Sequence, residues 1–196
     1  MTTVPWRFTE KDAIGFSGQG EVPVLLDGAR CVFGSWVIAE YLEATYADLP
    51  SLFGSATGRA LTRFVNQWVT GILHPAIARV IVPDLFLVLH EKDCDYFRAT
   101  REAAFGCSFD ALAAGREDAL ATLRRIVQPL RSTLATQPFV AGSAPAYADH
   151  VAFGAFQWAR TSGPIGLLAS DDPISAWCER MLDAYGGLAR TVPRAQ

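Results

Sequence analysis

The chain has 196 residues, 51% of them hydrophobic, and a formal net charge of −3 at pH 7. This length and composition fit a globular protein with one large or two small domains, and they exclude a disordered chain. The slightly acidic balance gives no basic surplus for nucleic acid, and the longest apolar run, residues 80–89, is far shorter than the ~20 residues of a membrane span. We therefore expect neither nucleic acid nor a membrane as a partner.

The first residues predict a short strand followed by a short helix. Pro5 restricts the strand, residues 3–8, to a sheet edge or a strand start, because proline cannot donate to a ladder. Thr9 is placed to cap the helix, with acidic residues in the first turn. Residues 1–12 lack the cationic start and apolar run of a secretion signal, so we expect no such signal.

Residues 21–46 predict a strand, a tight turn, a second strand and a helix. Asp27-Gly28 is a strong hairpin signal, because both central residues of a two-residue turn need positive φ. Pro23 belongs at the first position of its strand, and apolar residues fall at helical spacing after Ser35. The expected local structure is a ββα unit.

This unit offers two kinds of group to a ligand. The backbone N–H and C=O of Val22, held beside a proline, can pair with an extended, peptide-like molecule. Ser35 is expected where a helix presents unpaired N–H groups and the positive end of its dipole, a place suited to a carboxylate. The plainer interpretation is a structural unit in which Ser35 is an ordinary N-cap.

Beyond this unit the pattern turns helical. Residues 49–54 are typical of a linker, because Pro, Ser and Gly punctuate them. Residues 57–81 predict one long apolar helix, which we expect to kink or break at Pro75. Pro83-Asp84 is expected to begin another stretch.

Three more helical segments follow. Residues 93–113 predict an amphipathic helix, and residues 116–135 place apolar residues at steps of three and four, with a kink expected at Pro129. Asp149 is expected at the third position of an apolar core helix. The last helix is expected to have Pro173 in its first turn, to be capped by Asp171 or Asp172, and to end at two glycines.

The segments VPVLLDG, GSWVIAEYLEATY and LPSLF, with FVAG, AD and FG further on, resemble the glutathione transferase family. The resemblance implies an α+β fold in which a thioredoxin-like, glutathione-binding domain precedes an all-α domain. The first domain would occupy residues 1–48, a linker residues 49–58 and the helical domain residues 59–196. VPWRFTEKDAIGFSGQGEVPVL matches only the later half of the first domain, so its opening strand and helix are expected to be missing.

Three explanations compete for that short first domain: a wrongly assigned start codon, a truncated gene or a natural short form. In the family, the turn after the opening strand supplies the Ser, Tyr or Cys that activates the glutathione thiol. The catalytic residue of this chain is therefore unknown.

The resemblance also assigns a glutathione site to the ββα unit. It implies that the Val22-Pro23 bond is cis, that Val22 pairs its backbone with the cysteinyl part of glutathione, and that Ser35 holds the γ-glutamyl carboxylate. Two positions depart from the family. Glu21 stands where a basic residue is common, and it would repel the glycine carboxylate; Gly34 replaces the acidic or amide residue that helps to hold the γ-glutamyl end.

The implied function is that of a glutathione S-transferase-like protein. Glutathione would be the co-substrate, and its thiolate would attack a small aromatic or hydrophobic electrophile. The C-terminal half most resembles the bacterial β-etherase-like branch, which cleaves aryl ethers with glutathione, and the family's habit implies a homodimer through the first helices of the helical domain. The alternative is a non-catalytic binding or interaction protein, or a truncated gene product that has lost the catalytic residue.

Side chains outside this unit give weaker signals. Phe64, Trp68, Phe86 and Trp158 could line a pocket for an aromatic electrophile between the two domains, but aromatic residues at helical spacing are more often plain core. The three histidines are far apart in sequence, so no metal site is expected. The four cysteines form no CxxC pair and predict reduced thiols in a cytoplasmic protein.

Overall fold

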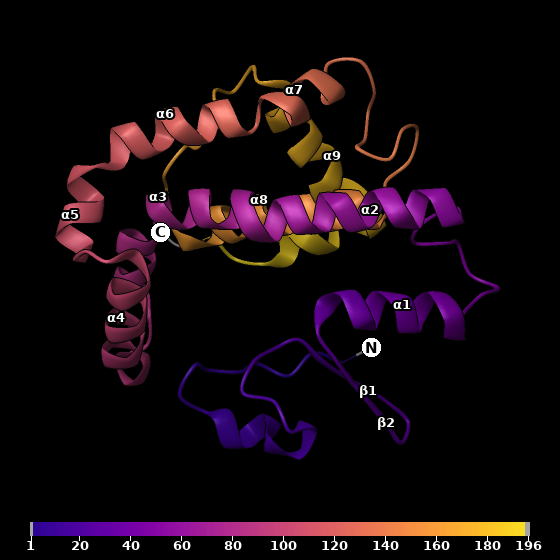
Figure 1. Ribbon diagram of the computed structural model, residues 1–196, viewed down its shortest axis with the longest axis horizontal. Coiled ribbons are helices and arrows are strands. Elements are labelled where there is room, and N and C mark those ends of the chain that lie inside the picture. Colours follow the sequence, from indigo (N-terminus) through magenta and orange to yellow (C-terminus); the bar gives the residue numbers. More distant parts are fainter. Residues whose placement is uncertain (1, 195–196) are drawn as a thin grey trace.

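The computed structural model describes residues 2–194, and its first part is a small ββα unit (Figure 1). Its elements are a 3-10 helix η1 (Lys11–Ser17), the strands β1 (Val24–Asp27) and β2 (Arg30–Phe33), and the helix α1 (Ser35–Thr45). The strands form a two-stranded antiparallel sheet in which Asp27 lies opposite Arg30. The hairpin is as predicted, but its central turn residues are Gly28 and Ala29 and not Asp27 and Gly28: Asp27 is the last residue of β1, and Gly28 takes a φ of +58°.

The second part is all helical. Its elements are α2 (Ala56–Trp68), the π-helical turn η2 (Val69–Leu73), α3 (His74–Leu87), α4 (Glu91–Phe105), α5 (Phe109–Ala114), α6 (Arg116–Ile126), α7 (Gln128–Leu134), α8 (Tyr147–Ser162), α9 (Pro173–Gly187) and the 3-10 turn η3 (Leu188–Thr191). Figure 1 shows α2, α3 and α8 running through the middle of this domain, with α6 and α7 along one side and the ββα unit on the other.

These two parts confirm the predicted α+β fold, a thioredoxin-like portion reduced to two strands in residues 2–194 and followed by an all-α domain. The predicted domain limits, residues 1–48, 49–58 and 59–196, stay predictions. In the structure α1 ends at Thr45 and α2 begins at Ala56.

The N-terminal segment does not form the strand predicted for residues 3–8. Phe8 instead packs against Phe97 of α4, with ring centroids 5.6 Å apart, and joins a small hydrophobic cluster there. Thr9 caps no helix: its N–H and hydroxyl both donate to the buried carboxylate of Asp93, at 3.1 and 2.9 Å. Because these contacts bridge 84 residues of sequence, local pattern could not predict them.

The first long helix does not break where its prolines predict. Pro75 lies inside the continuous helical run Ala56–Leu87, where a proline removes one backbone hydrogen bond, and the helix continues through Pro83 to Leu87. The π-helical turn Val69–Leu73, which ends just before Pro75, accommodates the missing N–H of this proline without breaking the helix. By length and composition alone the run Ala56–Leu87 is long enough to cross a membrane. Here it packs against α6 and α8 and buries the polar Thr62 and Asn66.

Later helices follow the predictions more closely. The amphipathic stretch at residues 93–113 divides into α4 and α5, because Gly106 takes a left-handed φ of +69° and ends α4. The kink predicted at Pro129 is confirmed, since α6 and α7 meet at the preceding turn. Asp172 caps α9 by accepting a hydrogen bond from the N–H of Ile174 at 2.9 Å.

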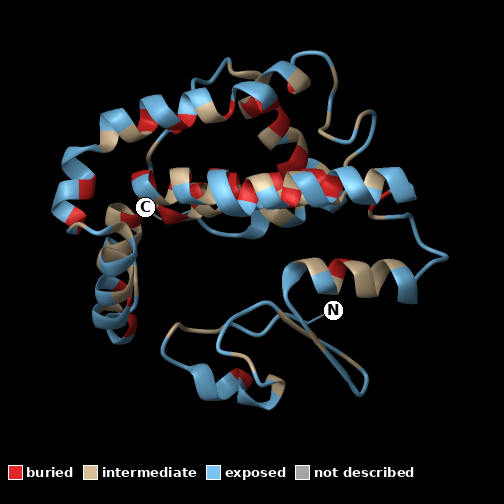
Figure 2. Cartoon of the chain, viewed as in Figure 1, coloured by how far each residue is buried: buried red, intermediate tan, exposed pale blue. Residues whose placement is uncertain are grey.

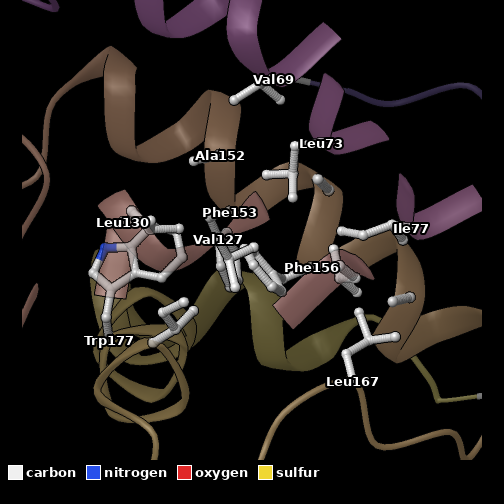
Figure 3. Packing of buried hydrophobic residues seen from close by; sticks show 14 of the residues in the cluster. Val69, Leu73, Ile77, Val127, Leu130, Ala152, Phe153, Phe156, Leu167 and Trp177 are labelled. Carbon is white, nitrogen blue, oxygen red and sulfur yellow. The ribbon is translucent and has the colours of Figure 1, made fainter. Parts of the chain in front are cut away.

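The main hydrophobic core lies between the run from α2 to α3 and the helices α6 to α9 (Figure 2). Figure 3 shows ten of its labelled members: Val69, Leu73, Ile77, Val127, Leu130, Ala152, Phe153, Phe156, Leu167 and Trp177. Asp149, fully buried at the start of α8, accepts four hydrogen bonds, from the backbone of residues 140, 141 and 146 and from the Trp177 indole. Through these hydrogen bonds, the carboxylate joins α8 to α9 and to the loop that precedes α8.

Candidate functional site

The predicted peptide-binding edge lies just before β1. The Val22-Pro23 bond is cis, as the family resemblance implies. The carbonyl of Pro23 accepts a hydrogen bond from the N–H of Gly34 at 3.1 Å, which closes the end of the hairpin. Val22 makes no backbone hydrogen bond within residues 2–194, and half of its surface is exposed. Its N–H and C=O are therefore available to an extended ligand.

Gly34, and not Ser35, is the N-cap of α1, which corrects the plainer interpretation of Ser35. Ser35 is the first helical residue, and it is exposed. The first intrahelical bond runs from the N–H of Ile38 to the carbonyl of Gly34, at 2.9 Å, so the amides before Ile38 have no helical partner. Gly34 takes φ +82° and ψ +126°, a conformation that side chains rarely adopt, which explains a glycine at this position.

Two residues that the sequence analysis missed hold this helix start in place. The hydroxyl of Tyr147, at the start of α8, donates to the carbonyl of Ser35 at 2.9 Å. Its ring packs on Trp36 and Phe53, with centroids 5.9 and 5.6 Å away. The guanidinium of Arg63 lies 4.6 Å from the centre of the Trp36 ring. Both partners are distant in sequence, and no local signal marked them.

The charges around the helix start are mixed. Glu21 is exposed beside Val22, and Gly34 brings no side chain to the site. Glu40, two turns into α1, forms an ion pair with Arg59 of α2, and this pair lowers the pKa of Glu40. Burial raises the pKa of the Tyr147 hydroxyl, so that group stays protonated at neutral pH. A bound carboxylate would meet helix amides, the Ser35 hydroxyl and a nearby cation.

The aromatic residues proposed for a substrate pocket are not all together. Phe64 and Trp68 line an apolar cavity of about 370 Å³ between α2, α7 and α8, with Leu130 and Val140 among its other walls. Trp158 does not line this cavity but packs on the main core, 6.0 Å from the His74 ring.

Phe86 belongs to the small cluster around Phe97. Arg59 and Arg63 reach α1 from α2, whereas Phe64 and Trp68 project about half a turn away around the same helix. The four aromatic residues therefore do not form one pocket between the domains, which corrects that part of the prediction.

Within residues 2–194, no group of three His, Cys, Asp or Glu side chains converges on a point where a metal ion could bind. His150 lies beside Asp149 in sequence, but its Nε2 is 2.9 Å from the Tyr185 hydroxyl, and the Asp149 carboxylate is saturated by N–H donors. The two therefore do not form a catalytic pair.

Solved structures share the fold over nearly the whole chain. A glutathione S-transferase of Ceriporiopsis subvermispora in complex with glutathione aligns with a TM-score of 0.77 and 19% identity, over 99% of this chain and 86% of that one. A glutathione transferase of Phanerochaete chrysosporium aligns with a TM-score of 0.72 and 24% identity, over 93% and 76%. A theta class glutathione S-transferase of Xanthomonas axonopodis pv. citri, with glutathione bound, gives 0.62 and 25%, over 96% and 80%.

A family profile described as "Glutathione S-transferase, C-terminal domain" matches residues 60–166, which is more than half of the chain. This match covers α2 to α8, the helices that carry Arg63 and Tyr147 to the start of α1. Together with the fold, it shows that the chain belongs to the glutathione S-transferase family.

Proposed function

We propose that this protein binds glutathione at Val22, Pro23 and Ser35 and uses its thiol against a small aromatic or hydrophobic electrophile. The observation that carries this proposal is the unpaired backbone of Val22 beside an exposed Ser35 at an open helix start. The cysteinyl part of glutathione would pair with Val22 as an added strand does. Its γ-glutamyl carboxylate would lie against the first-turn amides of α1 and the Ser35 hydroxyl. Two of the similar structures hold glutathione, which supports the ligand.

Glu21 and Gly34 weaken this site relative to the family pattern. A missing charge-assisted contact typically costs about 1.5–3 kcal/mol, so the affinity for glutathione would be lower by roughly ten- to hundredfold. Glu21 adds repulsion near the glycine carboxylate of the ligand. Arg63, whose guanidinium lies over the ring of Trp36 next to Ser35, is a cation that would offset part of the loss.

A second candidate function is binding without catalysis. A transferase needs a group that stabilises the glutathione thiolate. Around Ser35, within residues 2–194, the hydroxyl held in a fixed contact is that of Tyr147, and it already donates to the Ser35 carbonyl. This contact uses the hydroxyl proton that a thiolate would need, which favours a glutathione-binding or interaction protein.

One pair of measurements separates these functions. Calorimetry with glutathione up to about 20 mM tests binding, with S-methylglutathione as the ligand that lacks a free thiol. Product formation from an activated chloronitrobenzene then tests turnover. Binding with turnover supports the transferase, and binding without turnover supports the second candidate. No heat at millimolar glutathione contradicts the transferase and a glutathione-binding role, and it favours an interaction protein.

The nature of the electrophile is part of the proposal. The resemblance of the C-terminal half to β-etherase-like proteins suggests aryl ethers derived from lignin. Release of the phenol from a model β-aryl ether would support this branch. Turnover of the chloronitrobenzene with no ether cleavage would exclude it.

We further propose a homodimer in which the exposed apolar face of α2 is the contact. Leu61 and Phe64 are 64% and 73% exposed, and Phe64 also opens the apolar cavity beside it. Sedimentation velocity should show that Phe64→Glu converts a dimer to a monomer, while Leu87→Glu, exposed at the far end of α3, leaves the dimer intact. An unchanged dimer with a raised KM for the electrophile would instead assign Phe64 to the substrate pocket.

We also propose a cytoplasmic location. All four cysteines are free, and Cys31 is exposed. Free, accessible thiols fit a reducing compartment. Fractionation of cells producing the tagged protein tests this, and recovery in an oxidising compartment would contradict it.

A further inference from the structure

A cavity in the helical domain lies far from Ser35. It measures about 540 Å³ and is formed by the second half of α8, the loop at residues 163–168 and the facing side of α9. Ser35 contacts the first residue of α8, Tyr147, whereas the cavity reaches Arg160 near the other end of that helix. At 1.5 Å per residue the two ends are roughly 20 Å apart. The volume is that of a site for a small organic molecule.

The cavity has an apolar floor. Phe153, Phe156, Leu167 and Leu182 line it, and each is buried in the main core (Figure 3). Phe156 and Phe153 pack edge-on against Trp177, so their positions are fixed from behind. A rigid apolar floor favours the hydrocarbon part of a ligand.

One wall carries an incompletely paired cation. The Nε of Arg160 is buried and has no hydrogen-bond partner among residues 2–194. The same guanidinium donates only to uncharged oxygens, the carbonyl of Val192 at 3.1 Å and Oε1 of Gln157 at 3.4 Å. Arg190 nearby differs, because it pairs with the carboxylates of Glu179 and Asp183. Because the Arg160 guanidinium meets only uncharged oxygens among residues 2–194, its charge is suited to an anion in the cavity.

The surroundings of Arg160 reinforce this preference. Arg194 also lines the cavity, and burial together with the charges of Arg194 and Arg190 lowers the pKa of Arg160. Glu179 is on the rim, but its carboxylate is engaged by Arg190.

The cavity is also lined by the thiol of Cys178. Burial raises the pKa of Cys178 to about 12, so this group is a neutral thiol at physiological pH and a poor nucleophile. A ligand here is therefore held reversibly and not through a bond to sulfur.

We propose that this cavity is a second ligand site, separate from the glutathione site, that binds a small carboxylic acid with an apolar body. The carboxylate would accept hydrogen bonds from the guanidinium of Arg160, and the apolar body would lie on the phenylalanine and leucine floor. The proposal does not depend on glutathione binding at Ser35.

The test uses 2-naphthoate as the probe and 2-naphthamide as its uncharged counterpart, each titrated into the full chain by calorimetry. We expect naphthoate to bind about tenfold to hundredfold more tightly than the amide, the range that a charge-assisted pair supplies. Arg160→Gln should remove this preference. Arg180→Gln, on the same helix as Cys178 but outside the cavity, should keep it.

Two further readouts locate the site. Glutathione at 10 mM should leave the naphthoate affinity unchanged, and naphthoate should slow hydrogen exchange in residues 163–182. If Arg160→Gln does not fold, the preference of the wild-type chain for naphthoate over naphthamide and the pattern of hydrogen exchange still test the proposal. Equal binding of the two probes, displacement by glutathione or protection elsewhere in the chain would each overturn the proposal.

Discussion

Replacing Asp149 should destabilise this protein more than any other single carboxylate change discussed above. The side chain is fully buried, and its oxygens accept hydrogen bonds at 2.7 to 3.2 Å from three backbone amides and the Trp177 indole. Hydrogen bonds to a charged group contribute about 1.5–3 kcal/mol each, and a buried donor left without its acceptor costs about 1–3 kcal/mol. Asp149→Ala leaves four buried donors without an acceptor, so we expect the free energy of unfolding to fall by at least about 4 kcal/mol.

Asp149→Asn is the milder and more informative variant. One oxygen accepts from Val140 and Trp177, and the other accepts from Ala141 and Ala146. An amide keeps one acceptor and turns an N–H group toward the other two donors, so about half of the loss, roughly 2–3 kcal/mol, should remain.

Urea unfolding followed by far-UV circular dichroism measures these losses. For a domain of this size each kcal/mol lowers the melting temperature by roughly 2–4 °C, which gives a second reading. Asp183→Asn is the control, because that carboxylate is 67% exposed and solvent screens its pair with Arg190, so the change should cost little stability. A loss below about 1 kcal/mol for Asp149→Asn would refute the reasoning.

Three more predictions follow from the described contacts. Burial lowers the pKa of His74 below its ordinary 6.5, so the unfolded chain binds this proton more readily than the folded chain. The free energy of unfolding should therefore fall as the pH drops below about 6.5. Urea titrations at pH 7.5 and 5.5 should show a smaller fall for His74→Gln than for the wild-type chain, and an equal fall would contradict the assignment. Cys31 is exposed whereas the pKa of Cys178 is raised to about 12, so a thiol reagent at pH 8 should react first with Cys31, and Cys31→Ser should remove the fast phase of the absorbance change. Gly34→Glu should tighten glutathione binding by supplying the missing acceptor, while the positive φ at this position costs about 1–2 kcal/mol of stability. Calorimetry measures the affinity, and thermal melts measure the stability. Weaker binding in a folded variant would show that the site does not lack this acceptor.

Local chemistry predicted the parts of the fold that are decided locally. Gly28 marked the hairpin, although the turn lies one residue later than predicted, at Gly28-Ala29. Pro129 marked a real break between two helices, and the aspartate before Pro173 capped the last one. The family resemblance, and not the residues alone, implied the cis bond before Pro23.

Tertiary contacts decided what the sequence could not. Phe8 left its predicted strand because the cluster around Phe97 buries its ring, and Pro83 stayed helical within a helix packed against the core. In the site, Arg63 and Tyr147 reach the start of α1 from other helices, so no pattern in residues 21–46 could place them.

The most direct test of the central claim is a calorimetric titration of glutathione into the wild-type chain and Ser35→Ala side by side. The hydroxyl is exposed at an open helix start, and losing one hydrogen bond to a charged ligand group costs about 1.5 kcal/mol or more. The account predicts at least roughly tenfold weaker binding by Ser35→Ala with unchanged stability. Equal affinities, or no binding by the wild-type chain, would contradict it.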